Sequence, residues 1–128
     1  MPRVVHFEVH SSDPDRTIRF YSELFGWRFQ PWGPPGTYWL ITTGEEGRGI
    51  DGGVVPRRGA APSEGQPVNA FVCTVDVADA AQSLAKAISL GGSEALPVMP
   101  IPGAGWLCYA KDPDGTIFGM MQSDTSAA

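Results

Sequence analysis

The chain has 128 residues and a formal net charge of −5, from 9 Lys and Arg against 14 Asp and Glu. Its scattered basic residues argue against a nucleic-acid partner, and it contains no apolar stretch long enough to span a membrane. The two cysteines lie outside any CxxC pattern, and the N-terminal region has no continuous apolar signal segment. We therefore expect a reduced, cytoplasmic protein of one domain.

The first half predicts a strand, a helix and three further strands. Residues 4–10 alternate apolar and polar side chains, which is typical of a strand with one buried face. Asp13 is a suitable N-cap, Pro14 fits the first helical position, and Gly26 follows the last apolar residue of the helical pattern. The three strands that follow are expected over residues 27–32, 37–43 and 50–55.

The second half predicts the same order of elements. Residues 68–75 favour a strand, Asp76 is a candidate N-cap, and Gly91 and Gly92 are expected to end the helix. Three further segments are then expected to be extended: a proline-interrupted edge strand over 95–101, and strands over 105–111 and 116–122. Residues 112–115 (DPDG) predict the hairpin turn between the last two strands.

Nearly equal spacing of these signals indicates an internal duplication. The candidate caps Asp13 and Asp76 are separated by almost the same length of chain as the helix stops Gly26 and Gly91. The predicted domain over 1–128 consists of the following parts: a first module over 1–55, a linker over 56–67, a second module over 68–124 and a tail over 125–128.

The fold class predicted from this order is α+β, with paired βαβββ modules. We expect the modules to form one curved mixed sheet, with the helices on its convex side. The concave side is then a cup that is free to hold a ligand.

Two stretches carry a resemblance to a known family. They are residues 20–27 (FYSELFGW), which end the first helix, and residues 112–119 (DPDGTIFG), which form the last hairpin. Together with the order of elements, they resemble the vicinal oxygen chelate superfamily, which includes glyoxalase I, bleomycin-resistance proteins and extradiol dioxygenases. The resemblance covers nearly the whole chain, and it implies a small-molecule ligand and a homodimer.

The resemblance also implies where a divalent metal would bind in the metal-dependent members. His6 matches the ligand position on the first strand, whereas its counterpart in the second half falls on Asn69 or Ala70. The carboxylate position on the last strand is Gly119, and its counterpart in the first half lies near Asp51. Because a zinc or iron site usually needs three or four protein ligands, the metal site is expected to be degenerate and no cofactor is expected.

Independently of the family, the first strand places His6, Glu8 and His10 on one face, because strand side chains alternate. We expect these three to line the cup as ligand-binding residues. Glu8, between two imidazoles, is a candidate catalytic general base. A divalent metal at His6 stays open as an alternative, with Glu8 and one of three further candidates: Asp51, Asn69 or Cys73.

Four tryptophans are many for a chain of this length. Most pack in a core, but some aromatic residues of the strands are expected to face the cup. Trp39 and Trp106 are the candidates for ligand binding, and Gly119 is expected to open space beside them, since a glycine within a strand often marks a close approach.

Three functions follow from these residues. The first is a small-molecule binding protein for a ligand such as an aromatic metabolite or an antibiotic. The second is a metal-dependent lyase, isomerase or dioxygenase that uses His6. The third is a metal-free enzyme with Glu8 as its base, so the sequence leaves open whether the protein is an enzyme.

Overall fold

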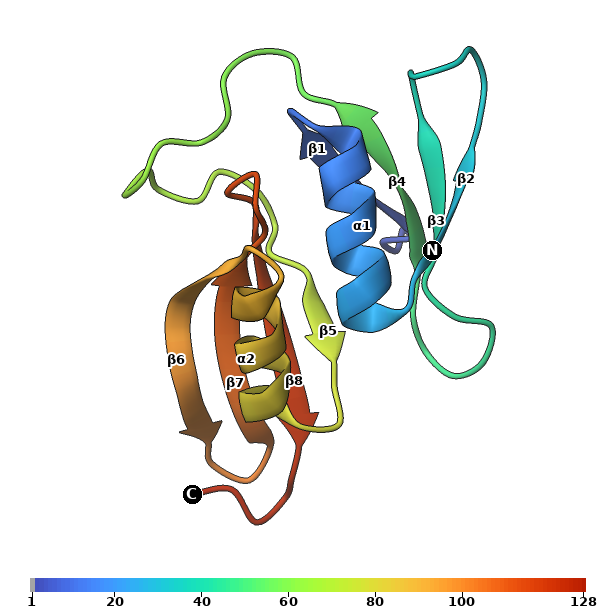
Figure 1. Ribbon diagram of the computed structural model, residues 1–128. Helices are drawn as coiled ribbons and strands as arrows, with labels where there is room; N and C mark the ends of the chain where they lie inside the picture. Colours follow the sequence, from blue (N-terminus) through green and yellow to red (C-terminus); the bar gives the residue numbers. More distant parts are fainter. Residues whose placement is uncertain (1) are drawn as a thin grey trace. The chain divides into compact units, whose positions relative to one another are not determined.

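The computed structural model describes residues 2–128, and the chain divides into two compact units, the first ending at Ala61 and the second beginning at Pro62. This division falls inside the predicted linker. Each unit has the order strand, helix and three strands, so the predicted α+β class and the paired βαβββ modules are confirmed (Figure 1). That the units pack into a single domain stays a prediction.

The first unit consists of β1 (His6–Ser11), α1 (Pro14–Phe25), β2 (Arg28–Pro31), β3 (Trp39–Thr42) and β4 (Asp51–Pro56). Its sheet has the strand order β1-β4-β3-β2, with β1 parallel to β4 and the other pairs antiparallel. The parallel pair arises because α1 carries the chain back across the sheet.

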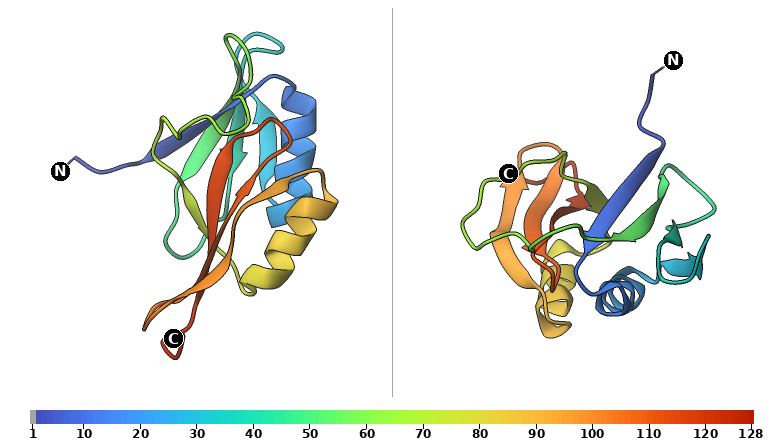
Figure 2. Two further views of the ribbon diagram at one scale, coloured as in Figure 1. Left: turned by 90° about the vertical axis from the view of Figure 1, so that its left-hand side faces the viewer. Right: turned by 90° about the horizontal axis from the view of Figure 1, so that it is seen from above.

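The second unit consists of β5 (Thr74–Asp76), α2 (Ala80–Ser89), β6 (Ser93–Ile101), β7 (Gly105–Lys111) and β8 (Ile117–Ser123). The strand order is β5-β8-β7-β6, which repeats the topology of the first sheet. The strands thus form two four-stranded sheets, one in each unit. Figure 2 shows each helix against one face of its own sheet.

The core of each unit lies between its helix and its sheet. In the first unit, Phe20, Tyr21 and Leu24 of α1 are buried together with Ile41 and Val54 of the sheet. In the second unit, the core residues are Ala80, Leu84 and Ala87 from α2 and Cys108, Ala110, Phe118 and Met120 from the sheet. The other face of each sheet has no helix of its own unit upon it.

Trp27 packs against aromatic side chains of α1 and β1. Its ring lies 5.4 Å from the ring of Tyr21 in a stacked arrangement and 5.7 Å from the ring of Phe7. The contact with Phe7 links α1 to β1 through aromatic side chains.

The start of α1 follows the prediction, whereas the start of α2 corrects it. Asp13 caps α1 by accepting a hydrogen bond from the backbone N–H of Arg16. The N-cap of α2 is Asp79, which accepts from Gln82, while Asp76 is the last residue of β5. Both aspartates precede the apolar face of the helix, so the pattern alone did not separate them.

The strand predicted over 68–75 is also shorter than expected, since β5 begins at Thr74. The preceding residues Val68 and Phe71 are exposed, and Phe71 exposes 94% of its surface. Apolar alternation suggested a strand here, but the described residues before Cys73 form no ladder with β8.

No helix within residues 2–128 is long and apolar enough to cross a membrane.

Replacing Asp79 by Ala should destabilise the protein by about 1 kcal/mol, because the first turn of α2 loses its capping acceptor. The matched change Asp76→Ala should alter the free energy of unfolding by less than about 0.5 kcal/mol. Urea denaturation followed by circular dichroism measures both. Equal losses in the two variants would contradict the assignment of the cap.

Candidate functional site

The exposed face of the first sheet carries the polar side chains of β1. His6, Glu8 and His10 are exposed, whereas Val9 and Ser11 on the opposite face are buried. The sequence predicted this alternation, and the structure places the three polar residues on one surface. We call this surface, together with the residues of β2, β3 and β4 on the same side, the open face.

Tyr38 joins two of these residues through hydrogen bonds. Its hydroxyl lies 2.8 Å from Nε2 of His6 and donates to Oε2 of Glu8 at 3.2 Å. A phenol has only one proton, so with that proton directed at Glu8 the bond to His6 requires the imidazole to donate. The hydrogen bonds therefore run in one direction, from His6 through Tyr38 to Glu8.

His10 lies on the other side of the Glu8 carboxylate. Its Nε2 is 3.6 Å from Oε1 of Glu8, and both side chains are about half exposed, at 54% and 44%. This separation is too long for a direct hydrogen bond and gives an ion pair only when the imidazole is protonated. Oε1 of Glu8 thus remains accessible for a ligand.

Gly53 makes the position of Tyr38 possible. It pairs with Glu8 across β1 and β4 and is buried. A Cβ atom at Gly53 would overlap the hydroxyl and the ring of Tyr38. Because Gly53 has no side chain, the phenol of Tyr38 can pack directly on the backbone of β4 and reach both Glu8 and His6.

The pKa of Tyr38 is raised above its usual value. Burial is the largest cause, followed by the hydrogen bond to Glu8 and the negative charge of that carboxylate. All three favour the neutral phenol. Tyr38 therefore keeps its proton at neutral pH and acts as a hydrogen-bond donor.

Trp39 and Trp106 lie on the helix-covered faces of their sheets, contrary to the expectation that they line the cup. By register, Trp39 shares the face of Val54, which is buried under α1. Trp106 lies on the face of Cys108, and its Nε1 donates to Asp124 at 3.1 Å. An aromatic residue directly before β3 does lie on the open face of the first sheet, as expected. It is Tyr38 and not Trp39, because neighbouring residues of an extended chain point to opposite faces.

Gly119 lies on the face of the second sheet that α2 does not cover, opposite Tyr109. A Cβ at Gly119 would come within 2.9 Å of both Cε1 of Tyr109 and Oγ1 of Thr74. The space at this glycine is therefore already filled by neighbouring side chains, and its role in ligand binding stays a prediction.

The structure corrects the spacing of the repeat. The true caps Asp13 and Asp79 are separated by the same length of chain as Glu8 and Thr74, each of which pairs with a glycine across its parallel strands. This offset matches His6 with Val72, rather than with Asn69 or Ala70. The spacing inferred from the sequence was too short because it used Asp76 as the second cap.

The corrected repeat does not fit the metal site that the resemblance implies. The two positions expected to supply carboxylates are Gly53 and Gly119, and the counterpart of His6 is Val72. Glycine and valine side chains offer no ligand atom. His6 itself is engaged through Nε2 with Tyr38.

The further metal candidates do not complete the set. Asp51 pairs with His6 across the strands, but its Oδ1 accepts from the backbone N–H of Thr43 at 2.9 Å. Cys73 is exposed and Asn69 precedes β5. Within residues 2–128, no three His, Cys, Asp or Glu side chains are grouped so that they could hold a metal ion.

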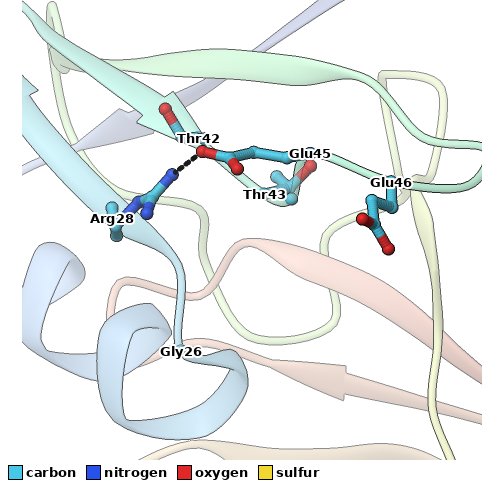
Figure 3. Close-up of a pocket in the computed structure, with 7 residues that line it drawn as sticks. Gly26, Arg28, Thr42, Thr43, Glu45 and Glu46 are labelled. Carbon is cyan, nitrogen blue, oxygen red and sulfur yellow. Dashed lines mark hydrogen bonds and ion pairs between the residues drawn. The ribbon is translucent and has the colours of Figure 1, made fainter.

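A shallow pocket of about 410 Å³ adjoins the open face near the β3–β4 connection. Its lining is mostly polar and includes Arg28, Thr42, Thr43, Glu45 and Glu46 (Figure 3). Arg28 donates to Glu45 at 2.9 Å across this pocket, and both side chains are largely exposed. This pocket could not be predicted from the sequence, because it depends on the path of a surface loop.

The expectation that some aromatic residues of the strands face the cup did not single out Tyr38 or its bonds to His6 and Glu8. The informative signal was the pair Gly52-Gly53 within a strand, because a glycine there often accommodates a bulky neighbour. The register that brings Tyr38 over Gly53 could not be derived from sequence alone.

Comparison with known proteins agrees with this architecture. The profile of the Glyoxalase/Bleomycin resistance protein/Dioxygenase superfamily matches residues 3–120. The chain belongs to this superfamily. The resemblance drawn from residues 20–27 and 112–119 is thereby confirmed.

One relative of this superfamily member is the "Putative glyoxylase CFP32" of Mycobacterium bovis, which is 27% identical over 120 residues. That match covers 91% of this chain but 44% of the relative, so the chain spans less than half the length of the curated relatives it matches. The activity of the longer protein is therefore not transferred to this chain.

Solved structures of other superfamily members share the fold. A glyoxalase-related enzyme from Fulvimarina pelagi superposes with a TM-score of 0.70 at 18% identity, covering 100% of this chain and 98% of that chain. A family enzyme from Burkholderia phytofirmans PsJN gives a TM-score of 0.71 at 13% identity, covering 93% and 97%. At such identities the likeness concerns the fold and not the reaction.

Replacing Gly53 by Ala should push the Tyr38 hydroxyl away from Glu8 and lower the pKa of Tyr38 toward its ordinary value. The crowding should also cost about 1 kcal/mol of stability. NMR titration of labelled tyrosine rings measures the pKa, and urea denaturation measures the stability. The control is Gly44→Ala, since a Cβ at Gly44 meets nothing within 4 Å.

The pH dependence of stability has a defined sign. The folded protein holds the Tyr38 proton more firmly than the unfolded chain does. Protonated Tyr38 therefore contributes to the free energy of unfolding in full below the usual tyrosine pKa. The contribution of Tyr38 to stability is lost as the pH rises through the raised pKa of Tyr38.

An unchanged Tyr38 pKa in the Gly53→Ala variant would contradict the proposed role of Gly53.

Proposed function

We propose that the protein binds a small organic molecule on the open face of the first sheet. The observation that carries this proposal is the directed hydrogen-bond array of His6, Tyr38 and Glu8. Such an array offers oriented polar groups before a ligand arrives, which reduces the ordering cost of binding. Because Gly53 has no side chain, Tyr38 can keep its place in the array.

Apolar side chains beside the array support the same function. Trp32 exposes 61% of its surface and lies edge-on to Tyr38, with ring centroids 6.0 Å apart. Leu40 is exposed opposite Gly53, on the same side as Glu8. Polar groups that set orientation, next to apolar groups that supply contact area, are the usual composition of a small-molecule site.

The ligand of this face is expected to be an aromatic metabolite or an antibiotic, bound without a metal. The membership of the superfamily supports a small-molecule ligand but does not name it. A homodimer and a cytoplasmic location stay predictions, as does the absence of nucleic-acid and membrane partners.

Ligand binding at this face should quench the fluorescence of Trp32. We expect a member of a panel of aromatic metabolites and antibiotics to give saturable quenching that is largely lost in Trp32→Phe. The matched control Trp106→Phe should keep the quenching, because Trp106 lies on a helix-covered face of the second sheet. Equal quenching in all three proteins would place the ligand elsewhere, and no quenching across the panel would count against the function.

A second candidate function is metal-free proton transfer with Glu8 as the general base. The observation that favours it is the accessible Oε1 of Glu8, on a carboxylate that Tyr38 holds in place through Oε2. A positioned carboxylate can remove a proton from a carbon next to a carbonyl group.

Proton abstraction by Glu8 predicts deuterium exchange into small aldehydes and ketones, followed by NMR in D2O with a chelator present. The change Glu8→Gln should lower the exchange rate by about a hundredfold, since a positioned base contributes at least that much. Glu23→Gln is the control, because Glu23 lies on α1 and not on the open face. Equal rates with both variants would exclude Glu8 as the base.

A further inference from the structure

The open face of the first sheet carries an excess of negative charge. Glu8 lies near the middle of β1, which is an edge strand of this sheet, and Asp51 pairs with His6 on the same side. Glu45 and Glu46 line the adjoining pocket. This distribution bears on the class of ligand that the proposed site would take.

Two cationic side chains near this face already have partners. Arg28 is paired with Glu45 at 2.9 Å, and Arg57 donates to the backbone carbonyl of His10 at 2.7 Å. An anionic ligand would therefore meet the Glu8 carboxylate, whereas Arg28 and Arg57 are already held by other groups.

The hydrogen-bonding capacity of Glu8 points the same way. Oε2 accepts from Tyr38, whereas Oε1 accepts no hydrogen bond among the described residues and is 3.6 Å from His10. A ligand that approaches Oε1 must bring a donor. A charged N–H donor forms the stronger bond to a carboxylate.

The aromatic groups beside Glu8 also favour a cation. Trp32 is exposed and meets Tyr38 edge to face, and Tyr38 in turn donates to Glu8, so the indole is the aromatic neighbour of the residue that holds the carboxylate. The face of an aromatic ring attracts a cation, and the attraction is greatest for tryptophan. The exposed side chain of Leu40 adds apolar contact area opposite Gly53.

We propose that this site selects an organic cation, in which an ammonium or amidinium group binds Oε1 of Glu8 and a flat apolar body lies against Trp32 and Leu40. The inference rests on the proposed function and adds the chemical class of the ligand. Glu8 determines the selectivity for a cation, and Tyr38 orients the Glu8 carboxylate through its hydrogen bond to Oε2.

Three probes of nearly equal size and shape test the selectivity: benzamidine, which is cationic, benzamide, which is neutral, and benzoate, which is anionic. Titration of the ¹⁵N-labelled full chain with each probe gives a dissociation constant and maps the site. Benzamidine should bind about tenfold more tightly than benzamide, which corresponds to a charge-assisted contact, and benzoate should bind more weakly than both.

The variant Glu8→Gln should remove the preference for benzamidine and leave benzamide binding within about twofold. Glu23→Gln removes the same charge from α1 and should keep the preference. Circular dichroism confirms that each variant folds. Should Glu8→Gln not fold, the ranking of the three probes on the unaltered protein still decides.

The outcomes separate the two proposals. Benzamide or benzoate binding on the open face as tightly as benzamidine would overturn the selectivity and leave the binding site standing. A preference for benzamidine that survives in Glu8→Gln would likewise overturn it. If none of the probes shifts the resonances of His6, Glu8 and Tyr38, both the selectivity and the site are contradicted.

Discussion

The two adjacent glycines of β4 are the constraint on which the first unit depends. Gly52 faces the helix and has the ring of Phe7 within 2.8 Å of where a Cβ would stand, while Gly53 faces the other way beneath Tyr38. One strand thus accommodates an aromatic ring on each side. Phe7 joins the cluster around Trp27 that fixes α1, and Tyr38 fixes the polar array. The core and the candidate site are therefore positioned by neighbouring residues of a single strand.

Local signals sufficed for much of the fold. The cap at Asp13, the stop at Gly26 and the hairpin at residues 112–115 each depend on interactions within a few residues, and each is present. Predictions failed where interactions between residues distant in sequence determine the structure. Asp76 and Asp79 both satisfy the local rule for a cap, and only the end of β5 distinguishes them. The candidate site was half predictable, since alternation gives the face of His6, Glu8 and His10, but the register of β3 against β4 gives Tyr38.

The two units share one topology but carry different polar side chains at equivalent positions. At the offset set by the two helix caps, Glu8 is matched by Thr74 and Gly53 by Gly119. Tyr38 lies over Gly53 and Tyr109 lies over Gly119, and among the described residues Tyr38 is the one that bonds to a carboxylate and an imidazole. The backbone arrangement is thus common to both units, whereas the carboxylate and the imidazole beside the tyrosine belong to the first. A functional argument for this chain has to rest on those side chains, because the fold is shared by proteins of different activities.

The prolines of β6 have a consequence for how the protein behaves at high concentration. This strand is an edge of the second sheet, contains Pro97 and Pro100, and has shifts in its register with β7 on either side of Leu96. Proline has no N–H to offer a further strand, and an irregular edge presents no continuous template for strand addition. The longest exposed strand edge of the second unit is thereby protected from growth into intermolecular sheets, so resistance to aggregation is built into the same segment that completes the fold.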